Sequence, residues 1–186
     1  ALSLTLTLAA LVFLLLDVNL AYYDHHVWKL MFGQPPSQGE SLHVEVMPEQ
    51  FAWNVRYAGL DNQFGTADDI VTLNDFHVPV NTPVIVQLSS RDVIHSFFLP
   101  NLRIKQDALP GMVTSIYFLA EKTGSFNIAY AQHCGLGHYR MKGSFIVDSP
   151  DDFKAFLEGK AKETEAAQPD DDENSTEQEG NSPAPA

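Results

Sequence analysis

The sequence has little cysteine and little basic charge. Its 186 residues contain one cysteine, Cys134, so no disulfide can form within the chain, and the cysteine count does not report the compartment. Lysine and arginine together number 11, against 24 aspartate and glutamate residues. The resulting net charge of −13 argues against a nucleic-acid partner, which would require a basic surface.

Charge is absent from the first sixteen residues, which are mostly leucine and alanine. A membrane span needs about 20 mainly apolar residues, and Asp17 interrupts this run a little early. We interpret residues 1–21 as a transmembrane helix that is truncated at its start. A signal-peptide core is the alternative, but the stretch has neither a basic leader nor a clear cleavage site. Tyr22, Tyr23 and Trp28 follow, as aromatic residues do at a membrane surface, and residues 22–40 read as an interfacial linker.

The central part of the chain has the pattern of β-structure. Apolar and polar residues alternate or form short apolar runs, separated by turns, at 42–46, 51–57, 84–88, 115–119, 125–130 and 143–147. This pattern predicts a β-sandwich or barrel domain over residues 41–150. A short helix is expected at 151–160. Residues 161–186 form an acidic tail with almost no large apolar side chains, so we expect it to be disordered.

One segment combines side chains that bind soft metals. Cys134, His138 and Met141 lie within eight residues, and His95 stands upstream after a predicted strand. Thiolate, imidazole and thioether ligands together suit copper. Taken singly, each of these residues is more often an ordinary core residue. Taken together, with β-strands on both sides, they match the ligand layout of a cupredoxin and predict a copper site.

At this point the sequence resembles cytochrome c oxidase subunit II, from about Leu42 to Val147. The resemblance is carried by the segments 49–53, 79–84, 92–97, 105–112 and 134–141. It implies a cupredoxin-like Greek-key β-sandwich, anchored in the cell membrane and lying on its periplasmic side. It also implies a subunit of a cytochrome c oxidase that receives electrons from a c-type cytochrome. Those electrons would pass to the heme-bearing catalytic subunit I, with which this chain and other oxidase subunits would assemble.

The resemblance also implies a ligand set, with one departure. The family binds a dinuclear copper centre, CuA, and on this chain its ligands would be His95, Cys134, His138, Met141 and the backbone carbonyl of Gln132. A second bridging cysteine is expected four residues before Cys134, where this chain has Tyr130. A phenol is a poor copper ligand at neutral pH. We therefore rank a single copper ion ahead of a dinuclear centre, with a copper-free domain or substitution by His133 as alternatives.

Aromatic and charged residues of the family's working surfaces have counterparts here. Phe51 and Trp53 resemble the patch where electrons enter, although Trp53 also reads as a core residue of a strand. Arg103 and Lys105 would face the heme-bearing subunit. The alternatives to a cytochrome c oxidase are a copper-free subunit II of a quinol oxidase or of a nitric oxide reductase of the same superfamily. A free-standing copper carrier on a membrane tether is disfavoured by the 105–112 motif.

Overall fold

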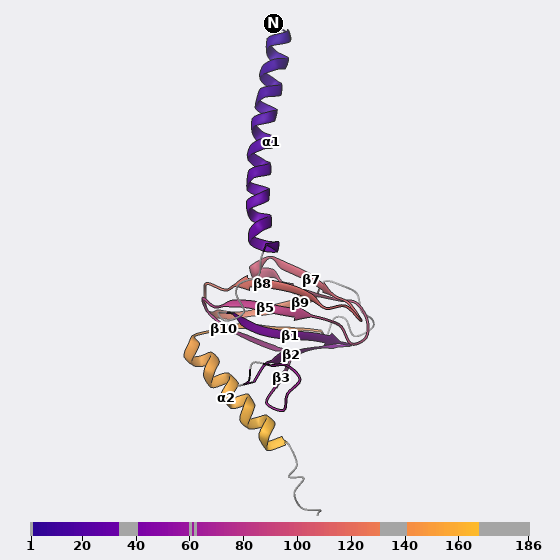
Figure 1. The fold of residues 1–186 in the computed structure, drawn as a ribbon, viewed down its shortest axis with the longest axis vertical. Coiled ribbons are helices and arrows are strands. Elements are labelled where there is room, and N and C mark those ends of the chain that lie inside the picture. Colours follow the sequence, from indigo (N-terminus) through magenta and orange to yellow (C-terminus); the bar gives the residue numbers. More distant parts are fainter. Residues whose placement is uncertain (1, 34–40, 60, 62, 131–140, 168–186) are drawn as a thin grey trace, which may run out of the picture.

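A long apolar helix stands apart from a two-layer β-sandwich in the structure of this chain (Figure 1). The structure, a computed structural model, describes residues 2–33, 41–59, 61, 63–130 and 141–167. A second helix lies against the sandwich near the C-terminal end of the described chain.

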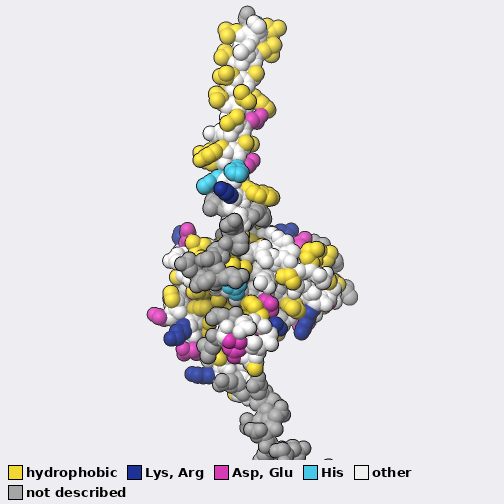
Figure 2. Space-filling model, viewed as in Figure 1, with side chains coloured by type: hydrophobic (Ala, Val, Ile, Leu, Met, Phe, Trp, Pro, Cys, Tyr) yellow, Lys and Arg dark blue, Asp and Glu magenta, His cyan; other side chains and the backbone are white. Residues whose placement is uncertain are grey.

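The first helix, α1, runs from Leu2 to Phe32 and exposes apolar side chains over most of its length (Figure 2). By length and composition, its segment Leu2–Lys29 is able to cross a membrane. The helix therefore extends through most of the stretch that the sequence assigned to an interfacial linker. Residues 22–32 contain neither glycine nor proline, so no residue ends the helix before Gly33.

Within the residues that the structure describes, ten strands form the sandwich. Their bounds are β1 Leu42–Glu49, β2 Ala52–Tyr57, β3 Ile70–Leu73, β4 Asp75–Pro79, β5 Pro83–Leu88, β6 His95–Leu99, β7 Ile104–Ala108, β8 Thr114–Leu119, β9 Gly124–Tyr130 and β10 Gly143–Asp148. One sheet has the order β3-β2-β1-β5-β8 and the other the order β4-β10-β9-β6-β7. The pairs β1–β5 and β4–β10 are parallel, and the remaining neighbours are antiparallel. The predicted two-sheet sandwich is confirmed.

Aromatic side chains fill the space between the two sheets. Phe76 packs with Phe145 at a centroid distance of 5.3 Å and with Phe97 at 6.1 Å, and Trp53 meets Phe97 at 5.6 Å. All four side chains are at most 1% exposed. Burial of such large side chains stabilises a fold by about 1.5–3 kcal/mol each, so this cluster fixes the sheets against one another.

The second helix, α2, runs from Pro150 to Ala167, and Ser149 caps its N-terminus. The Ser149 hydroxyl accepts the Asp152 N–H at 3.2 Å and donates to the Asp152 carboxylate at 2.6 Å. Good helix formers continue past Lys160, so residues 161–167 are helical and do not belong to a disordered tail. Residues 168–186 lie outside the described part of the chain.

Candidate metal centre

Three strands of the second sheet converge at one end of the sandwich. Strand β6 is antiparallel to β9, with Phe97 opposite Tyr130, so His95 at the start of β6 lies where β9 ends. Strand β10 is antiparallel to β9, with Gly143 opposite Ile128, so the chain returns at this same end. The sheet thus brings His95 and the residues that precede β10, Met141 among them, to one edge.

His95 is buried and held by a carboxylate. Its side chain is 0% exposed, and its Nε2 lies 2.8 Å from Oδ1 of Asp92. The Asp92 carboxylate also accepts the backbone N–H groups of Gln50 and Val93, each at 2.6 Å. Partial burial would raise the pKa of Asp92, but hydrogen bonds from His95, Gln50 and Val93 outweigh it and hold the pKa below its usual range. An ionised Asp92 accepts a hydrogen bond from the Nε2 N–H, which leaves Nδ1 as the nitrogen suited to bind a metal.

Trp53 contacts both His95 and the start of β10. Its ring lies edge-on to the His95 imidazole, with the ring centroids 6.4 Å apart, and it is 0% exposed. A Cβ atom added to Gly143 would lie 3.2 Å from Trp53 and 2.8 Å from Ile128. Glycine at this position therefore lets β10 begin directly against the indole. Trp53 packs in the core beside His95, as the core interpretation of this residue expected.

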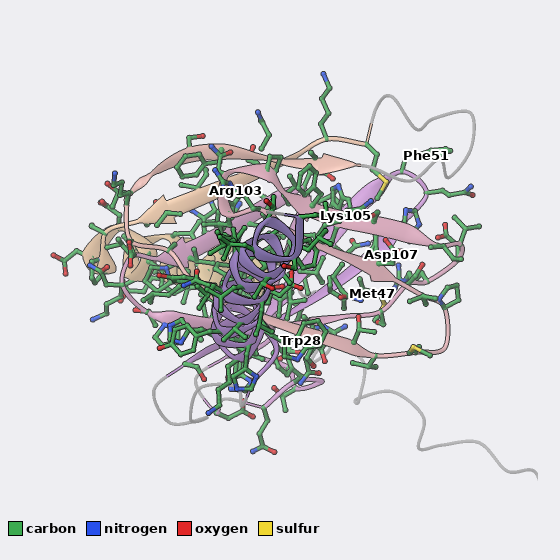
Figure 3. All side chains as sticks on the ribbon, turned by 90° about the horizontal axis from the view of Figure 1, so that it is seen from above. Trp28, Met47, Phe51, Arg103, Lys105 and Asp107 are labelled. Atoms are coloured by element: carbon green, nitrogen blue, oxygen red, sulfur yellow. The ribbon has the colours of Figure 1, made fainter. Side chains whose placement is uncertain are left out.

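Apolar side chains reach the surface beside His95. The Asp92–Gln50 hydrogen bond ties the turn before β2 to the loop before β6, and an ion pair between Arg91 and Glu49 at 2.9 Å lies beside it. On these two segments Phe51 is 37% exposed, and Val93 and Ile94 are 36% and 44% exposed. The predicted electron-entry residues thus occupy different environments, with Phe51 at the rim of the sandwich (Figure 3) and Trp53 buried in the core. Their role in electron entry stays a prediction.

The ligand set can be followed only in part. Met141 is 2% exposed and packs in the hydrophobic core, as a buried thioether ligand would. Cys134, His138, Gln132 and His133 lie outside the described residues. Among the residues that are described, no group of three or more His, Cys, Asp or Glu side chains is placed to hold a metal ion. The donors present, an oriented buried imidazole and a buried thioether, fit the chemistry of copper, which binds nitrogen together with soft sulfur.

A charged surface lies on the side of the sandwich nearest α1. Strand β7 runs beneath α1 in Figure 1, and Figure 3 shows Arg103, Lys105 and Asp107 around the foot of that helix. All three side chains are exposed, and Arg103 adopts a left-handed backbone conformation with φ of 56° after a short 3-10 turn, Pro100–Leu102. Arg103 and Lys105, which the resemblance assigned to a partner surface, are therefore accessible to a partner subunit.

Sequence reasoning missed the role of Asp92. The residue stands three positions before His95, and this spacing alone is too common to indicate an interaction. The signal lies in the combination of a carboxylate, a histidine and a turn immediately before a strand, because such a turn folds residue i back toward residue i+3. The structure adds this carboxylate to the candidate site.

The comparisons with known proteins agree with this geometry. Residues 59–148 match the family described as cytochrome c oxidase subunit II, periplasmic domain. The chain is 36% identical over 154 residues to the alternative cytochrome c oxidase subunit 2 of Bradyrhizobium diazoefficiens, covering 71% of this chain and 54% of that protein. It is 33% identical over 117 residues to the ubiquinol oxidase subunit 2 of Acetobacter aceti, covering 63% of this chain and 36% of that protein. The chain thus spans about half, or less, of the length of these curated relatives.

A solved structure supports the same fold. The periplasmic domain of subunit II of cytochrome oxidase from Bradyrhizobium japonicum superimposes with a TM-score of 0.61 and 26% sequence identity. The match covers 70% of this chain and 99% of that domain. The predicted cupredoxin-like sandwich is thereby confirmed.

Proposed function

Because this chain belongs to the cytochrome c oxidase subunit II family, we propose that it is subunit II of a respiratory heme–copper terminal oxidase. In this role it accepts electrons from a c-type cytochrome and delivers them to the heme-bearing catalytic subunit, where oxygen is reduced. The chain itself contributes the electron-transfer domain and a membrane anchor. The sandwich lies on the extracytoplasmic side of the cell membrane, and α1 crosses that membrane.

The convergence of His95 and Met141 at one edge of the second sheet carries this proposal. The strand pairing that supports it is fixed by the register of β6, β9 and β10, and it does not depend on the loop between β9 and β10. Cys134 and His138 belong by sequence to residues 131–140, between these two strands and outside the described part of the chain. Copper, when bound, would supply a one-electron redox centre.

The described residues prepare this site in two ways. Asp92 fixes the orientation and the tautomer of His95, and burial of His95 and Met141 keeps water from their donor atoms. A rigid sheet edge that holds its ligands in place favours electron transfer, because the ligands then move little when the metal changes charge. Since Tyr130 stands where a second bridging cysteine would be expected, we propose a single copper ion held by His95, Cys134, His138 and Met141.

A copper-free subunit of a quinol oxidase is the second candidate. Two observations favour it: the similarity to a ubiquinol oxidase subunit 2, and Tyr130 in place of a cysteine. The retention of four ligand side chains counts against it, because a subunit that has no metal to bind has no reason to keep them together.

Metal analysis of the purified chain separates the two candidates. After copper loading, we expect about one copper per chain, an intense thiolate-to-copper absorption band, and EPR hyperfine splitting from one copper nucleus. Splitting shared between two nuclei would instead indicate a dinuclear centre. The copper-free candidate makes two different predictions. The chain would show neither the absorption band nor the EPR signal at full loading. The assembled oxidase would turn over quinol but not reduced cytochrome c. His95→Ala serves as the loss-of-site control.

A further inference from the structure

Strand β3 forms one edge of the first sheet and leaves backbone groups open. Strand β2 pairs with it antiparallel on one side. Just after β3, the Asn74 N–H donates to the Trp53 carbonyl at 2.7 Å, and the Asn74 side chain accepts the Trp53 N–H at 2.8 Å. Backbone groups of successive residues in an antiparallel strand face alternately toward and away from a given neighbour, so Thr72, like Asn74, faces β2. The N–H and C=O groups of Val71 and Leu73 therefore point away from β2, toward the open edge.

The open edge of β3 lacks the protection that β4, an edge strand of the second sheet, receives. At β4, the Tyr57 hydroxyl accepts the His77 N–H at 2.7 Å and donates to the His77 carbonyl at 3.0 Å. Within the described residues, no group outside the sheet bonds to the backbone of Val71 or Leu73. Residues 70–73 contain neither a charge nor a proline, which often protect an exposed edge. Strand β3 is therefore open to pairing with a further strand.

A groove lies between this edge and α2. It has a volume of about 440 Å³ and is lined by Val71, Thr72 and Leu73 of β3 and by Lys160 and Glu163 of α2. Pockets that bind ligands measure roughly 300–1,000 Å³. Val71 and Leu73 are 53% and 60% exposed, so the groove presents apolar side chains as well as open backbone groups. Strand β3 and α2 lie at the end of the sandwich far from α1, and the groove therefore stays accessible when α1 is in a membrane (Figure 1).

The charged residues around the groove leave it negative. Lys160 donates to Glu163 at 2.8 Å, so these two side chains form an ion pair. Asp75, which also lines the groove, lies 3.2 Å from Nε2 of His77, and Nδ1 of the same ring lies 2.6 Å from Asp148. Two carboxylates thus share one imidazole, and this cluster keeps a negative charge whether the ring is neutral or charged. A basic side chain complements it.

We propose that this groove binds an extended segment of a partner protein, which adds to β3 as a further strand. The backbone of the segment pairs with the open N–H and C=O groups of Val71 and Leu73. Side chains of a strand alternate in direction, so apolar residues of the segment lie beside Val71 and Leu73. The residues between them turn toward Asp75 and Glu163, where basic side chains fit. The partner is therefore recognised by a short stretch of alternating apolar and basic residues.

Hydrogen exchange of the full chain in detergent tests the proposal. The probe is a peptide of about six residues in which valine and lysine alternate. We expect about 1 mM peptide to slow amide exchange at Val71 and Leu73 by at least about tenfold, because their N–H groups gain a partner. Exchange at Thr72, whose N–H faces β2, should change little and serves as the internal reference. Unchanged exchange at both Val71 and Leu73 would overturn the proposal.

Two matched peptides separate strand addition from simple attraction between charges. The same valine–lysine peptide with N-methylated backbone amides keeps its charge but loses its backbone donors, so it should no longer bind. A peptide that alternates valine and glutamate keeps the donors but reverses the charge, and it should bind about tenfold more weakly. Fluorescence anisotropy of labelled peptides measures the three affinities. Equal affinity of the methylated and unmethylated peptides would show that no strand is added and would overturn the proposal.

Proline variants of β3 test which backbone groups face the groove. Val71→Pro removes an N–H that points to the open edge, so the chain should still fold but bind the valine–lysine peptide at least about tenfold more weakly. Val71→Ala keeps that N–H and should retain most of the affinity. Thr72→Pro removes an N–H that faces β2 and should instead destabilise the sandwich. Native affinity in a folded Val71→Pro variant would overturn the proposal. If Val71→Pro does not fold, the N-methylated peptide decides.

A charge variant and the oligomeric state identify the occupant. Glu163→Gln should weaken binding of the valine–lysine peptide by about threefold, whereas Glu158→Gln, about 140° around α2, should leave it unchanged. An equal effect of both variants would overturn the assignment of a basic segment. Dimerisation of the native chain that is lost in Val71→Pro would mean that a second copy occupies the edge, which would overturn the partner proposed here. None of these measurements requires copper, an electron donor or a catalytic subunit, so their failure is distinguishable from failure of the proposed function.

Discussion

The carboxylate of Asp92 controls which nitrogen of His95 is available to a metal. Asp92→Asn preserves the shape of the side chain but replaces a charged acceptor with an amide, so His95 is no longer held in a single tautomer. We expect copper affinity to fall by about tenfold, the usual effect of losing a carboxylate behind a ligating histidine. Competition with a copper chelator measures this change. Asp107→Asn, on the exposed part of β7, is the control and should bind copper as the native chain does.

Tyr130 occupies the position that would distinguish one copper from two. If the loop after β9 has kept the family geometry, Tyr130→Cys supplies the second bridging thiolate. We then expect a second copper ion per chain, seen as an increase in copper content and as EPR splitting shared between two nuclei. Tyr130→Phe, which adds no ligand, should leave the copper content unchanged. Loading of only one copper in Tyr130→Cys would show that the loop no longer fits a pair.

The buried phenol of Tyr57 makes the free energy of unfolding depend on pH in the alkaline range. Its phenol is buried and its pKa is raised, so the folded protein keeps it neutral above pH 10, where the unfolded chain ionises. Stability is therefore unaffected below pH 10 and is lost as pH rises further, by about 1.4 kcal/mol per pH unit for one proton. In Tyr57→Phe, this contribution to the decrease of unfolding free energy with pH disappears. Urea unfolding of the solubilised chain at several alkaline pH values measures the unfolding free energy of both proteins. The same pH dependence in the native chain and in Tyr57→Phe would contradict the prediction.

At the scale of single elements, α1 carries one feature that a plain membrane anchor does not need. Asp17 lies within the apolar span, and the sequence has no basic residue from Leu2 to Asp24. Ser3, Ala10, Asp17 and Asp24 recur every seven residues and so follow one line along the helix. Small and polar residues mark helix contacts in membranes, and charged residues there face protein. Under the proposed function, this line should therefore face a helix of the catalytic subunit.

Replacement of Asp17 tests this orientation. Asp17→Leu should insert at least as well as the native helix but should reduce copurification of the other oxidase subunits by about fivefold, since one interhelical polar contact is lost. Asn19→Leu makes a similar change about 200° around the helix and should have little effect. The measurement is the ratio of catalytic subunit to tagged chain after purification. An equal loss in both variants would argue against a specific polar contact.

Some elements were predictable from sequence, and others depend on tertiary context. Alternation over 42–46 and 51–57 indicated β1 and β2, because their inward residues repeat every second position. The end of α1 was placed too early, because aromatic and charged residues at 22–32 resemble a linker but are compatible with helix. The ligand pattern predicted that His95 and Met141 share a copper site, and this stays a prediction. The Asp92–His95 pair and the carboxylates around His77 join residues that no local pattern links.

At the scale of the whole molecule, the exposed charges of β7 lie on the side of the sandwich nearest the membrane helix. Under the proposed function this surface meets the catalytic subunit. Lys105→Glu reverses a charge there, and we expect weaker assembly of the oxidase, with a greater effect at low salt than at high salt, because surface charges are screened. Lys154→Glu, on the outer face of α2, is the matched control. Assembly yield at two salt concentrations measures the effect, and identical yields for both variants would contradict it.

The chain leaves β9 at Tyr130 and resumes before β10, and these two strands are hydrogen-bonded neighbours whose pairing is set by Gly143 opposite Ile128. The strand ends on either side of residues 131–140 are thus held at a fixed spacing by this pairing. Under the proposed function, replacement of this one short stretch would therefore change the copper ligands while leaving the described strand pairing as it is.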